Sequence, residues 1–174
     1  MNNCFNAKLR PFNLSDSTSL AQQANNRLIW ENLRDRFPHP YTKMDAIHFI
    51  QIVSITSPTT DFAVDVNGSA IGAAGIVLKE DVFRGNGEIG YWIGQEFWGK
   101  GIGSFIVKEL VRIGFEEFKL YRLYAEVFDN NIASARVLEK NGFIKEATLK
   151  QAIIKDSVRL NLNVFSILNP NVLR

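Results

Sequence analysis

The apolar positions in the first part of the chain predict one short strand and a long helix. Ala7–Phe12 has the pattern of a strand, which Pro11 would stop. Leu14–Leu33 has helical spacing, with Ser15 or Asp16 as its N-cap. The predicted inner face of this helix consists of Leu20, Ala21, Ala24 and Leu28.

Two prolines separate this helix from the next. The segment FPHPY at 37–41 cannot continue a helix, because proline lacks a backbone N–H and restricts the residue before it. Thr42 is a predicted N-cap, since Asp45 follows three residues later as in a capping box. The second helix is expected to end before Pro58, and its apolar stripe consists of Ala46, Ile47, Phe49, Ile50 and Val53.

From Asp61 onward the pattern predicts strands alternating with helices. Asn67-Gly68 lies between two apolar runs and is typical of the type I′ turn of a β-hairpin. The elements expected after this hairpin are a strand at 88–93, a helix at 101–118, a strand at 121–128, a helix at 132–140 and two strands within 144–168, joined by a turn near Lys155-Asp156.

This order of elements predicts a mixed α/β (α+β) fold in a single domain of residues 1–174. The long helix at 101–118 requires a crossover between the strands on either side of it, so we expect those strands to be parallel neighbours. Their carboxyl ends would then lie at the same edge of the sheet, where α/β proteins commonly bind ligands.

Composition and charge exclude several classes of protein. The 174 residues are 46% hydrophobic and 22% charged, which is typical of a globular chain and not of a disordered one. The formal net charge of +2, without a run of Lys or Arg, does not indicate a nucleic-acid partner. The N-terminus lacks the pattern of a signal peptide, and no apolar run is long enough to span a bilayer. Because Cys4 is the one cysteine, an internal disulfide framework is excluded. We therefore expect a cytoplasmic protein that binds neither membranes nor nucleic acid.

The most informative stretch is EIGYWIGQEFWGKGIGS at 88–104. Here a short strand leads into Gly99, Gly101 and Gly103 at the expected start of a helix. Glycine lets the backbone approach a ligand closely, and the N–H groups at the N-terminus of a helix favour negative charge. The stretch predicts a loop that binds phosphate or pyrophosphate; a tight turn without a ligand is the alternative.

Several common motifs do not fit this loop. Gly94-x-x-x-x-Gly99-Lys100 is followed by Gly101, not by the Ser or Thr that binds Mg²⁺ in a Walker A loop. A dinucleotide fingerprint that began at Gly99 would need a glycine where the chain has Ser104. The G-x-S-x-G motif of serine hydrolases is absent. Two histidines and one remote cysteine do not indicate a metal site, so we expect none.

A second unit of strand, Asn-x-x-Ser and helix follows, and with it the chain closely resembles the GNAT superfamily of acetyl-CoA-dependent N-acetyltransferases. The resemblance runs from about Leu9 to Leu168, and its most specific parts are EIGYWI at 88–93, WGKGIG at 98–103 and NIASARVLEKNGF at 131–143. NLRDRFPHPY at 32–41 is similar to the group of ribosomal-protein serine/alanine N-terminal acetyltransferases. The resemblance implies a mostly antiparallel twisted sheet, with helices on both faces and a central parallel strand pair that splays at the cofactor cleft.

The resemblance also implies where acetyl-CoA binds. In the family, main-chain N–H groups of the glycine loop wrap the pyrophosphate, and the matching residues here are Trp98, Gly99, Lys100, Gly101, Ile102, Gly103 and Ser104. Family members usually carry Gln or Arg at the position of Trp98. Backbone groups of Trp92 and Ile93 would bind the pantetheine arm, and an N–H near Ile93 would stabilise the oxyanion. Asn131 would bind the pantetheine amide, with a helix N-cap as the alternative role.

The catalytic residues implied by the resemblance are Glu88 and Ser134. Acetyl transfer needs a neutral amine, whereas a free alkylammonium has a pKa of about 10, so a base is useful. Glu88 matches the strand glutamate that serves as base in several members. Many members protonate the departing thiolate with a tyrosine where this chain has Leu138. Ser134, which would also contact the cofactor, is the substitute implied here, and Tyr124 is a further candidate.

The sequence thus predicts an N-acetyltransferase in which a primary amine attacks acetyl-CoA directly within a ternary complex. The amine is left open between a peptide N-terminus and a small molecule. His39 and Tyr41 border the segment that lies beside the acceptor site in the family, whereas His48 is expected on the surface. A non-catalytic sensor that binds acyl-CoA is the alternative function, and a homodimer is left open because dimers are common in the family.

Overall fold

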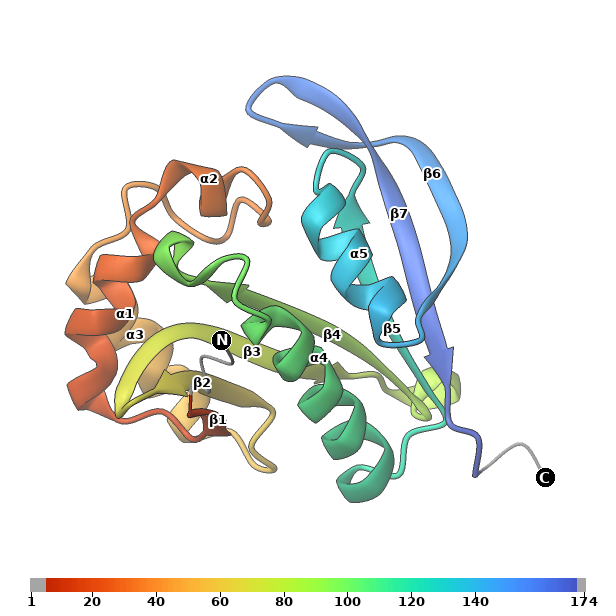
Figure 1. Cartoon of the computed structure of the whole chain (residues 1–174), viewed down its shortest axis with the longest axis horizontal. Coiled ribbons are helices and arrows are strands. Elements are labelled where there is room, and N and C mark those ends of the chain that lie inside the picture. Colours follow the sequence, from red (N-terminus) through yellow and green to blue (C-terminus); the bar gives the residue numbers. More distant parts are fainter. Residues whose placement is uncertain (1–5, 172–174) are drawn as a thin grey trace. The chain divides into compact units, whose positions relative to one another are not determined.

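Within residues 6–171, seven strands form one hydrogen-bonded sheet in the order β1-β2-β3-β4-β5-β7-β6. A computed structural model describes residues 6–171, so Cys4 lies outside the described residues. The strands are β1 (Ala7–Arg10), β2 (Asp61–Val66), β3 (Ser69–Leu78), β4 (Asn86–Ile93), β5 (Arg122–Phe128), β6 (Ile144–Lys155) and β7 (Val158–Leu168). The α-helices are α1 (Ser17–Ala24), α2 (Arg27–Trp30), α3 (Lys43–Ser54), α4 (Ile102–Arg112) and α5 (Ile132–Lys140) (Figure 1). Four shorter helical segments are η1 (Leu14–Asp16), η2 (Asp81–Phe83), η3 (Gln95–Phe97) and the π-helical η4 (Ile113–Glu117).

The predicted mixed sheet with a central parallel pair is confirmed. β4 and β5 are parallel, and their register joins Asn86, Gly87 and Glu88 to Arg122, Leu123 and Tyr124. The pairs β1–β2, β2–β3, β5–β7 and β6–β7 are antiparallel. The long helix α4 and η4 supply the crossover that a parallel pair requires.

Contacts divide the chain into two units, and β3 and β4 each contribute residues to both. One unit comprises Met1–Gly75 with Tyr91–Ile106, and the other Ile76–Gly90 with Val107–Arg174. The extent of a single domain, 1–174, stays a prediction.

In the first unit, α1 and α3 lie side by side (Figure 1) and share a core with β2 and β3. Ala63 of β2 faces Ala73 of β3, and both are buried beneath the helices. The predicted hairpin turn is confirmed, because Asn67 and Gly68 adopt φ values of 54° and 86°. The predicted capping box is confirmed too: the Thr42 N–H donates to Asp45 Oδ2 at 2.8 Å.

The prediction of one continuous helix at Leu14–Leu33 is wrong. α1 ends at Ala24, and α2 begins only at Arg27. The Asn25 side chain accepts a hydrogen bond from the Tyr41 N–H (3.0 Å), and Asn26 caps α2 by accepting from the Leu28 N–H (2.9 Å). These side-chain bonds compete with the helical ladder and turn the chain. As a result Leu28, predicted on the inner face, is 44% exposed, and Ile29 is buried instead.

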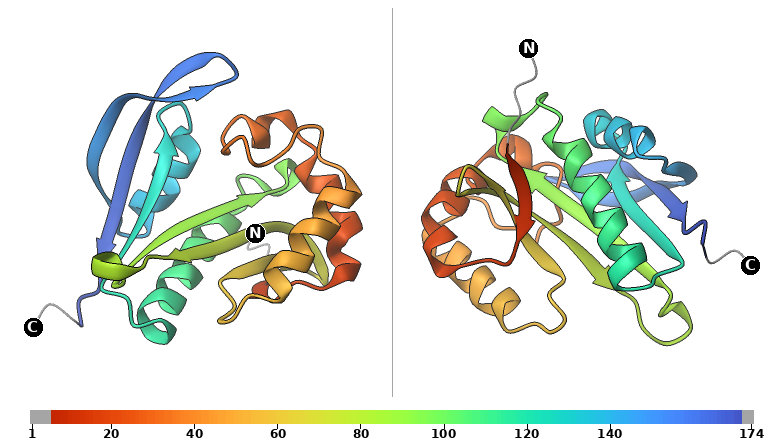
Figure 2. Two further views of the ribbon diagram at one scale, coloured as in Figure 1. Left: turned by 180° about the vertical axis from the view of Figure 1, so that it is seen from behind. Right: turned by 60° about the horizontal axis from the view of Figure 1, so that its bottom comes forward.

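In the second unit, β7 lies between β5 and β6, and α5 covers one face of these strands (Figures 1 and 2). Leu138 of α5 and Phe165 of β7 are each 1% exposed, and Leu123 of β5 is fully buried. The turn between β6 and β7 is made by Asp156 and Ser157, whose positive φ values of 49° and 65° suit a tight hairpin. The predicted pair of C-terminal strands is therefore confirmed.

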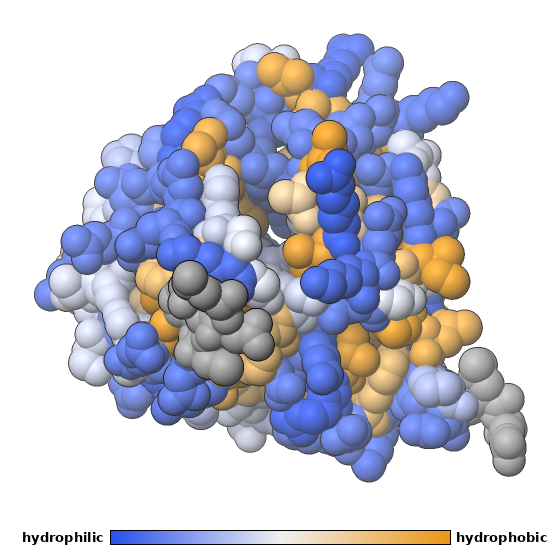
Figure 3. Space-filling view, viewed as in Figure 1, coloured by the Kyte–Doolittle hydropathy of each residue, from blue (hydrophilic) through white to orange (hydrophobic). Residues whose placement is uncertain are grey.

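None of the helices within residues 6–171 is long and apolar enough to cross a membrane. On the face shown in Figure 3, hydrophilic residues predominate, and apolar residues occur among them in small groups.

A buried charge cluster ties β1 to β2 and to η1 in the first unit. Arg10 donates to Asp65 Oδ2 at 2.7 Å and makes a bidentate contact with Asp16 at 2.7 and 2.8 Å. Asp65 and Asp16 are 2% and 6% exposed. Burial alone would raise the pKa of Asp16, but hydrogen bonds from Arg10 and from the Asn13 N–H bring the pKa below its ordinary value. Arg10 therefore compensates two carboxylates that have little access to water.

We predict that Arg10→Gln lowers the free energy of unfolding by about 3 kcal/mol at neutral pH, because two buried carboxylates lose their cation. The difference from wild type should shrink as the pH falls through the lowered pKa of Asp16, since protonation removes its charge in both proteins. Urea denaturation at several pH values measures this effect. Arg27→Gln, which removes the exposed ion pair with Glu31, is the control and should cost no more than about 1 kcal/mol. Equal losses in the two variants would contradict the prediction.

Candidate functional site

Glu88 lies in a small charged cluster in the second unit. Its Oε2 atom is 2.7 Å from Lys79 Nζ and 3.4 Å from the Tyr124 hydroxyl, which donates to it. Glu88 and Tyr124 come together because they are opposite each other in the parallel register of β4 and β5. Lys79 follows β3, and its N–H donates to the Asn86 carbonyl of β4 at 3.1 Å. The site of Glu88 thus depends on three neighbouring strands.

Cations surround the ring of Tyr124 in this cluster. Lys79 Nζ lies 5.4 Å and the Arg122 guanidinium 5.1 Å from the ring centroid. Burial by itself would lower the pKa of Lys79, but its hydrogen bonds with Glu88 and Tyr124 outweigh burial and raise the pKa. Lys79 therefore remains charged at neutral pH and keeps a cation beside the Glu88 carboxylate. A cavity of about 400 Å³ is lined by Lys79, Glu80, Phe83, Asn86, Arg122 and Tyr124.

The glycine loop lies in the first unit and has the backbone conformation that its sequence predicts. Gly99 and Gly101 adopt φ values of 72° and 81°, in the left-handed region that favours glycine. A Cβ at either position would meet no heavy atom within 4 Å, so the space beside the loop is open. The Phe105 N–H donates to the Gly101 carbonyl at 3.1 Å, where α4 begins. The backbone N–H groups before residue 105 lie at the N-terminus of the helix, where the helix itself supplies no acceptor. Binding of an anion by this part of the loop stays a prediction.

Trp98 has a structural role that the sequence did not indicate. Its indole N–H donates to the Ile93 carbonyl at 2.9 Å, and its backbone N–H donates to the Gln95 carbonyl at 3.1 Å. Both bonds lie within the turn that joins β4 to the glycines. The binding of pyrophosphate by Trp98, Gly99, Lys100, Gly101, Ile102, Gly103 and Ser104 stays a prediction.

The end of β4 is packed closely against β3. A Cβ at Gly72 would lie 2.1 Å from the Trp92 carbonyl oxygen, so only glycine allows this approach. The Trp92 ring meets Phe37 edge-on at a centroid distance of 5.5 Å, and Ile93 is 7% exposed. The side chains of Trp92 and Ile93 thus pack into the first unit, and their backbones are the candidates for contact with pantetheine.

Asn131 and Ser134 meet at the start of α5 in the second unit. Asn131 Oδ1 accepts a hydrogen bond from the Ser134 N–H at 3.1 Å, which makes Asn131 the N-cap of α5. The capping role that the sequence offered as an alternative is therefore present. A role of either side chain toward coenzyme A stays a prediction. Leu138, at the position of the family tyrosine, is 1% exposed and belongs to the core.

The residues around the proline break also take distinct places. His39 packs beside the Trp30 ring at 5.8 Å, whereas His48 is exposed on α3 as predicted. Tyr41 is buried, and burial, together with the nearby Asp45 carboxylate, raises its pKa to about 12. Tyr41 is therefore neutral over the physiological pH range, and its side chain belongs to the core of the first unit.

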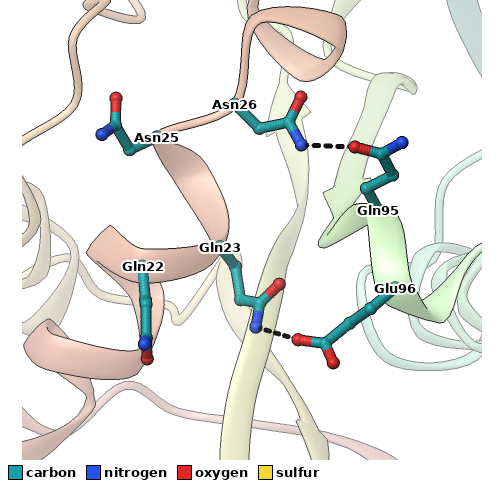
Figure 4. Close-up of a pocket in the computed structure, with 6 residues that line it drawn as sticks. All are labelled: Gln22, Gln23, Asn25, Asn26, Gln95 and Glu96. Atoms are coloured by element: carbon teal, nitrogen blue, oxygen red, sulfur yellow. Dashed lines mark hydrogen bonds between the residues drawn. The ribbon is translucent and has the colours of Figure 1, made fainter.

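A polar hollow of about 490 Å³ in the first unit was not predicted. It is lined by Gln22, Gln23, Asn25, Asn26, Gln95 and Glu96 (Figure 4). Four of these side chains form two hydrogen bonds between η3 and residues 22–26, where α1 ends and the chain turns into α2 (the α1–α2 corner). Their partners are about seventy residues apart in sequence, so no local pattern could have paired them. The contact between Lys79 and Glu88 was not predicted either, because it depends on how the strands pair.

Within residues 6–171 there is no group of three or more His, Cys, Asp or Glu side chains that could hold a metal ion.

Comparisons with known proteins agree with these elements. The chain matches a family model described as an acetyltransferase (GNAT) domain over residues 7–144. The uncharacterized N-acetyltransferase p20 of Bacillus licheniformis is 31% identical over 126 residues, which are 71% of this chain and 70% of p20. The ribosomal-protein-serine acetyltransferase of Escherichia coli is 26% identical over 130 residues, 68% of this chain and 73% of that protein. The relatives thus include the ribosomal-protein acetyltransferases that the sequence resembles.

Two further relatives match over a shorter part of the chain, and a solved structure has the same fold at low sequence identity. Two Bacillus subtilis N-acetyltransferases are 41% and 40% identical over 83 residues, so the chain spans about half the length of these relatives (47% and 46%). The structure of RimL, a ribosomal L7/L12 alpha-N-protein acetyltransferase in complex with coenzyme A, superposes with a TM-score of 0.82 at 18% identity. That superposition covers 97% of this chain and 96% of RimL, which shows that the two folds agree.

We predict that Asn131→Ala lowers the free energy of unfolding by about 1 kcal/mol, because α5 loses its N-cap. Asn131→Ser keeps a capping oxygen and should stay within a few tenths of a kcal/mol of wild type. Chemical denaturation of both variants provides the measurement. If the alanine variant were as stable as the serine variant, the cap would not contribute to stability.

Proposed function

Because the chain belongs to the GNAT acetyltransferase family, we propose that it transfers the acetyl group of acetyl-CoA to a primary amine by direct attack within a ternary complex. The observation that carries this proposal is the glycine loop. Its left-handed glycines lead into the N-terminus of α4, and open space lies beside them. Such a loop suits the pyrophosphate of coenzyme A, because backbone N–H groups and the helix dipole both favour negative charge.

In this proposal the N–H groups from Gly99 to Ser104 bind the pyrophosphate, and Lys100 adds a positive charge. The indole and backbone N–H groups of Trp98 are bonded inside the turn, so Trp98 contributes by holding the loop. Backbone groups of Trp92 and Ile93 bind the pantetheine arm, with an N–H near Ile93 directed at the thioester oxygen. The amide of Asn131 binds pantetheine while its carbonyl oxygen caps α5.

The chemistry consists of one acyl transfer. The neutral amine attacks the thioester carbonyl carbon, a C–N bond forms, the C–S bond breaks, and coenzyme A leaves as a thiolate. Glu88 accepts the proton of the amine, directly or through a water molecule. Lys79, 2.7 Å away, stabilises the carboxylate form of Glu88 before the proton arrives. Ser134 protonates the thiolate, and Tyr124, whose hydroxyl contacts Glu88, is the second candidate for this role.

The acceptor we propose is a protein N-terminus or a small primary amine. The E. coli relative is named for acetylating a ribosomal protein, which favours the first of these classes. However, the C-terminal strand carries Leu160-Asn161 where that group usually has an acidic residue. A cytoplasmic location, a homodimeric state and a single domain over 1–174 remain predictions.

A screen of amines and N-terminal peptides, with detection of the released thiol, tests the proposed activity. Thiol release that depends on one acceptor class supports the enzyme and identifies that class. Binding of acetyl-CoA without thiol release from any acceptor would instead support the sensor function. Failure to bind acetyl-CoA at all would contradict both.

We predict that Gly101→Ala weakens acetyl-CoA binding about tenfold, because an alanine at a φ of 81° strains the loop by about 1–2 kcal/mol. Calorimetric titration with acetyl-CoA measures the dissociation constant. Gly90→Ala is the matched control, since a Cβ there also meets no atom within 4 Å and Gly90 is not among the glycines with positive φ. Equal affinity in the two variants would contradict a role of the loop conformation in binding.

We predict that Glu88→Gln lowers kcat by about 10²-fold and that Ser134→Ala lowers it by at least tenfold, with the KM for acetyl-CoA little changed. Steady-state kinetics with an acceptor from the screen provides the measurement. Glu139→Gln on the exposed face of α5 is the control and should leave kcat unchanged. If neither Glu88→Gln nor Ser134→Ala slowed thiol release, the proposed roles would be wrong.

A further inference from the structure

Two side-chain hydrogen bonds connect the α1–α2 corner to η3, the turn that precedes the glycine loop. Gln23 Nε2 donates to Glu96 Oε1 at 2.6 Å, and Asn26 Nδ2 donates to Gln95 Oε1 at 2.8 Å. Figure 4 shows the two bonds side by side, with Gln22 pointing away from η3. Consecutive residues of one short turn are therefore held by two side chains from another part of the first unit.

The corner that supplies these donors is itself well held. Asn26 accepts from the Leu28 N–H at 2.9 Å with its carbonyl oxygen while its amide nitrogen reaches Gln95. The neighbouring Asn25 accepts from the Tyr41 N–H at 3.0 Å. Both functional ends of the Asn26 amide are thus used, and the corner forms a fixed support for η3.

Hydrogen bonds connect the residues of the turn at 94–98, which joins β4 to the glycines, so we treat this turn as one block. The Gly94 N–H donates to the Ile71 carbonyl at 2.8 Å, and the Phe97 N–H donates to the Gly94 carbonyl at 3.0 Å. The Trp98 indole closes the block by donating to the Ile93 carbonyl at 2.9 Å. We therefore expect a displacement of Gln95 or Glu96 to move Trp98 and the first glycine of the loop, Gly99.

The Gln23 side chain packs closely against Gly94. A Cβ at Gly94 would lie 1.8 Å from Gln23 Oε1 and 2.6 Å from its Cδ. The Gln23 side chain thus crosses directly over the backbone of Gly94 to reach Glu96. Gln23 therefore contacts the first residue of the turn, Gly94, as well as Glu96.

We propose that Gln23 and Asn26 are positioning residues for the acetyl-CoA loop, acting through Glu96 and Gln95. The inference rests on the proposed function, because it assumes that the loop at 98–104 binds the pyrophosphate. Neither side chain needs to touch the cofactor. Each restricts η3 to the arrangement in which Gly99 and Gly101 begin the loop at the N-terminus of α4.

The energetics require that the two bonds act together. Each one is exposed to solvent, and a single exposed polar contact contributes little to stability. Two bonds to consecutive residues, however, restrict a short turn to one conformation. Without them, ligand binding would have to order the turn, and the lost conformational entropy would weaken binding. The apparent affinity of the loop rises in proportion to the fraction of molecules in the competent conformation. We therefore expect a large effect only when both bonds are lost.

The test compares acetyl-CoA binding by wild type and by the double variant Gln23→Ala/Asn26→Ser. Serine at position 26 keeps an oxygen that can cap α2 but is too short to reach Gln95. Calorimetric titration should give a dissociation constant about tenfold higher for the double variant. With an acceptor from the screen, the KM for acetyl-CoA should rise by a similar factor while kcat changes less than twofold.

Further variants separate positioning from a general loss of structure. Gln22→Ala removes an amide from the same hollow without touching η3 and should leave the dissociation constant unchanged. In the Asn26→Ser background, the exchange Gln23→Glu/Glu96→Gln replaces the remaining bond by an amide–carboxylate pair of reversed polarity. This triple variant should bind acetyl-CoA as Asn26→Ser alone does, and more tightly than Gln23→Ala/Asn26→Ser. Thermal melting of each variant without ligand shows whether it is folded.

The outcomes distinguish this inference from the proposed function. Absence of acetyl-CoA binding by the wild type would overturn the proposed function. Binding by the wild type with an unchanged dissociation constant in the folded double variant would overturn the inference alone. So would an affinity of the triple variant Gln23→Glu/Asn26→Ser/Glu96→Gln as low as that of Gln23→Ala/Asn26→Ser, when Gln22→Ala behaves as wild type.

Discussion

The hydrogen bond from the Gly94 N–H to the Ile71 carbonyl, 2.8 Å long, fixes the end of β4 against β3. The candidate cofactor loop depends on this point. One residue earlier, the Ile93 carbonyl accepts from the Trp98 indole, and Gly72 allows the Trp92 carbonyl to approach β3. Because the backbone is held at residues 92 to 94, the turn that follows begins in a defined direction. The left-handed Gly99 and Gly101 then lead it into α4.

The charged cluster around Glu88 depends on the register of the strands. The parallel register brings Tyr124 opposite Glu88, and the hairpin of β3 and β4 brings Lys79 to the same carboxylate. In the proposed acetyl transfer, the amine would deliver its proton to Glu88 beside the cationic Lys79. Because the cation favours the carboxylate form, it keeps Glu88 ionised before the amine binds and favours release of the proton to solvent afterwards. The pair thus suits repeated turnover in the proposed acetyl transfer.

Much of the fold could be predicted because its signals are local. Thr42 and Asp45 form a capping box three residues apart, Asn67-Gly68 adopts the positive φ values of a hairpin turn, and Asn131 caps α5 through Ser134. The helix at Leu14–Leu33 was wrong for the opposite reason. Its apolar spacing is helical, but Asn25 is recruited by Tyr41, sixteen residues away, and the helical ladder ends there. A tertiary contact outweighed a local preference.

The family, the glycine loop and the elements from β2 to β7 could be read from the sequence, since each depends on preferences that a few neighbouring residues express. The folded structure was needed to show which side chains meet. It placed Lys79 at Glu88, directed the Trp98 indole to the Ile93 carbonyl, and joined Gln23 to Glu96. These pairs depend on strand register and on the packing of the α1–α2 corner, and neither is encoded in a short window of sequence.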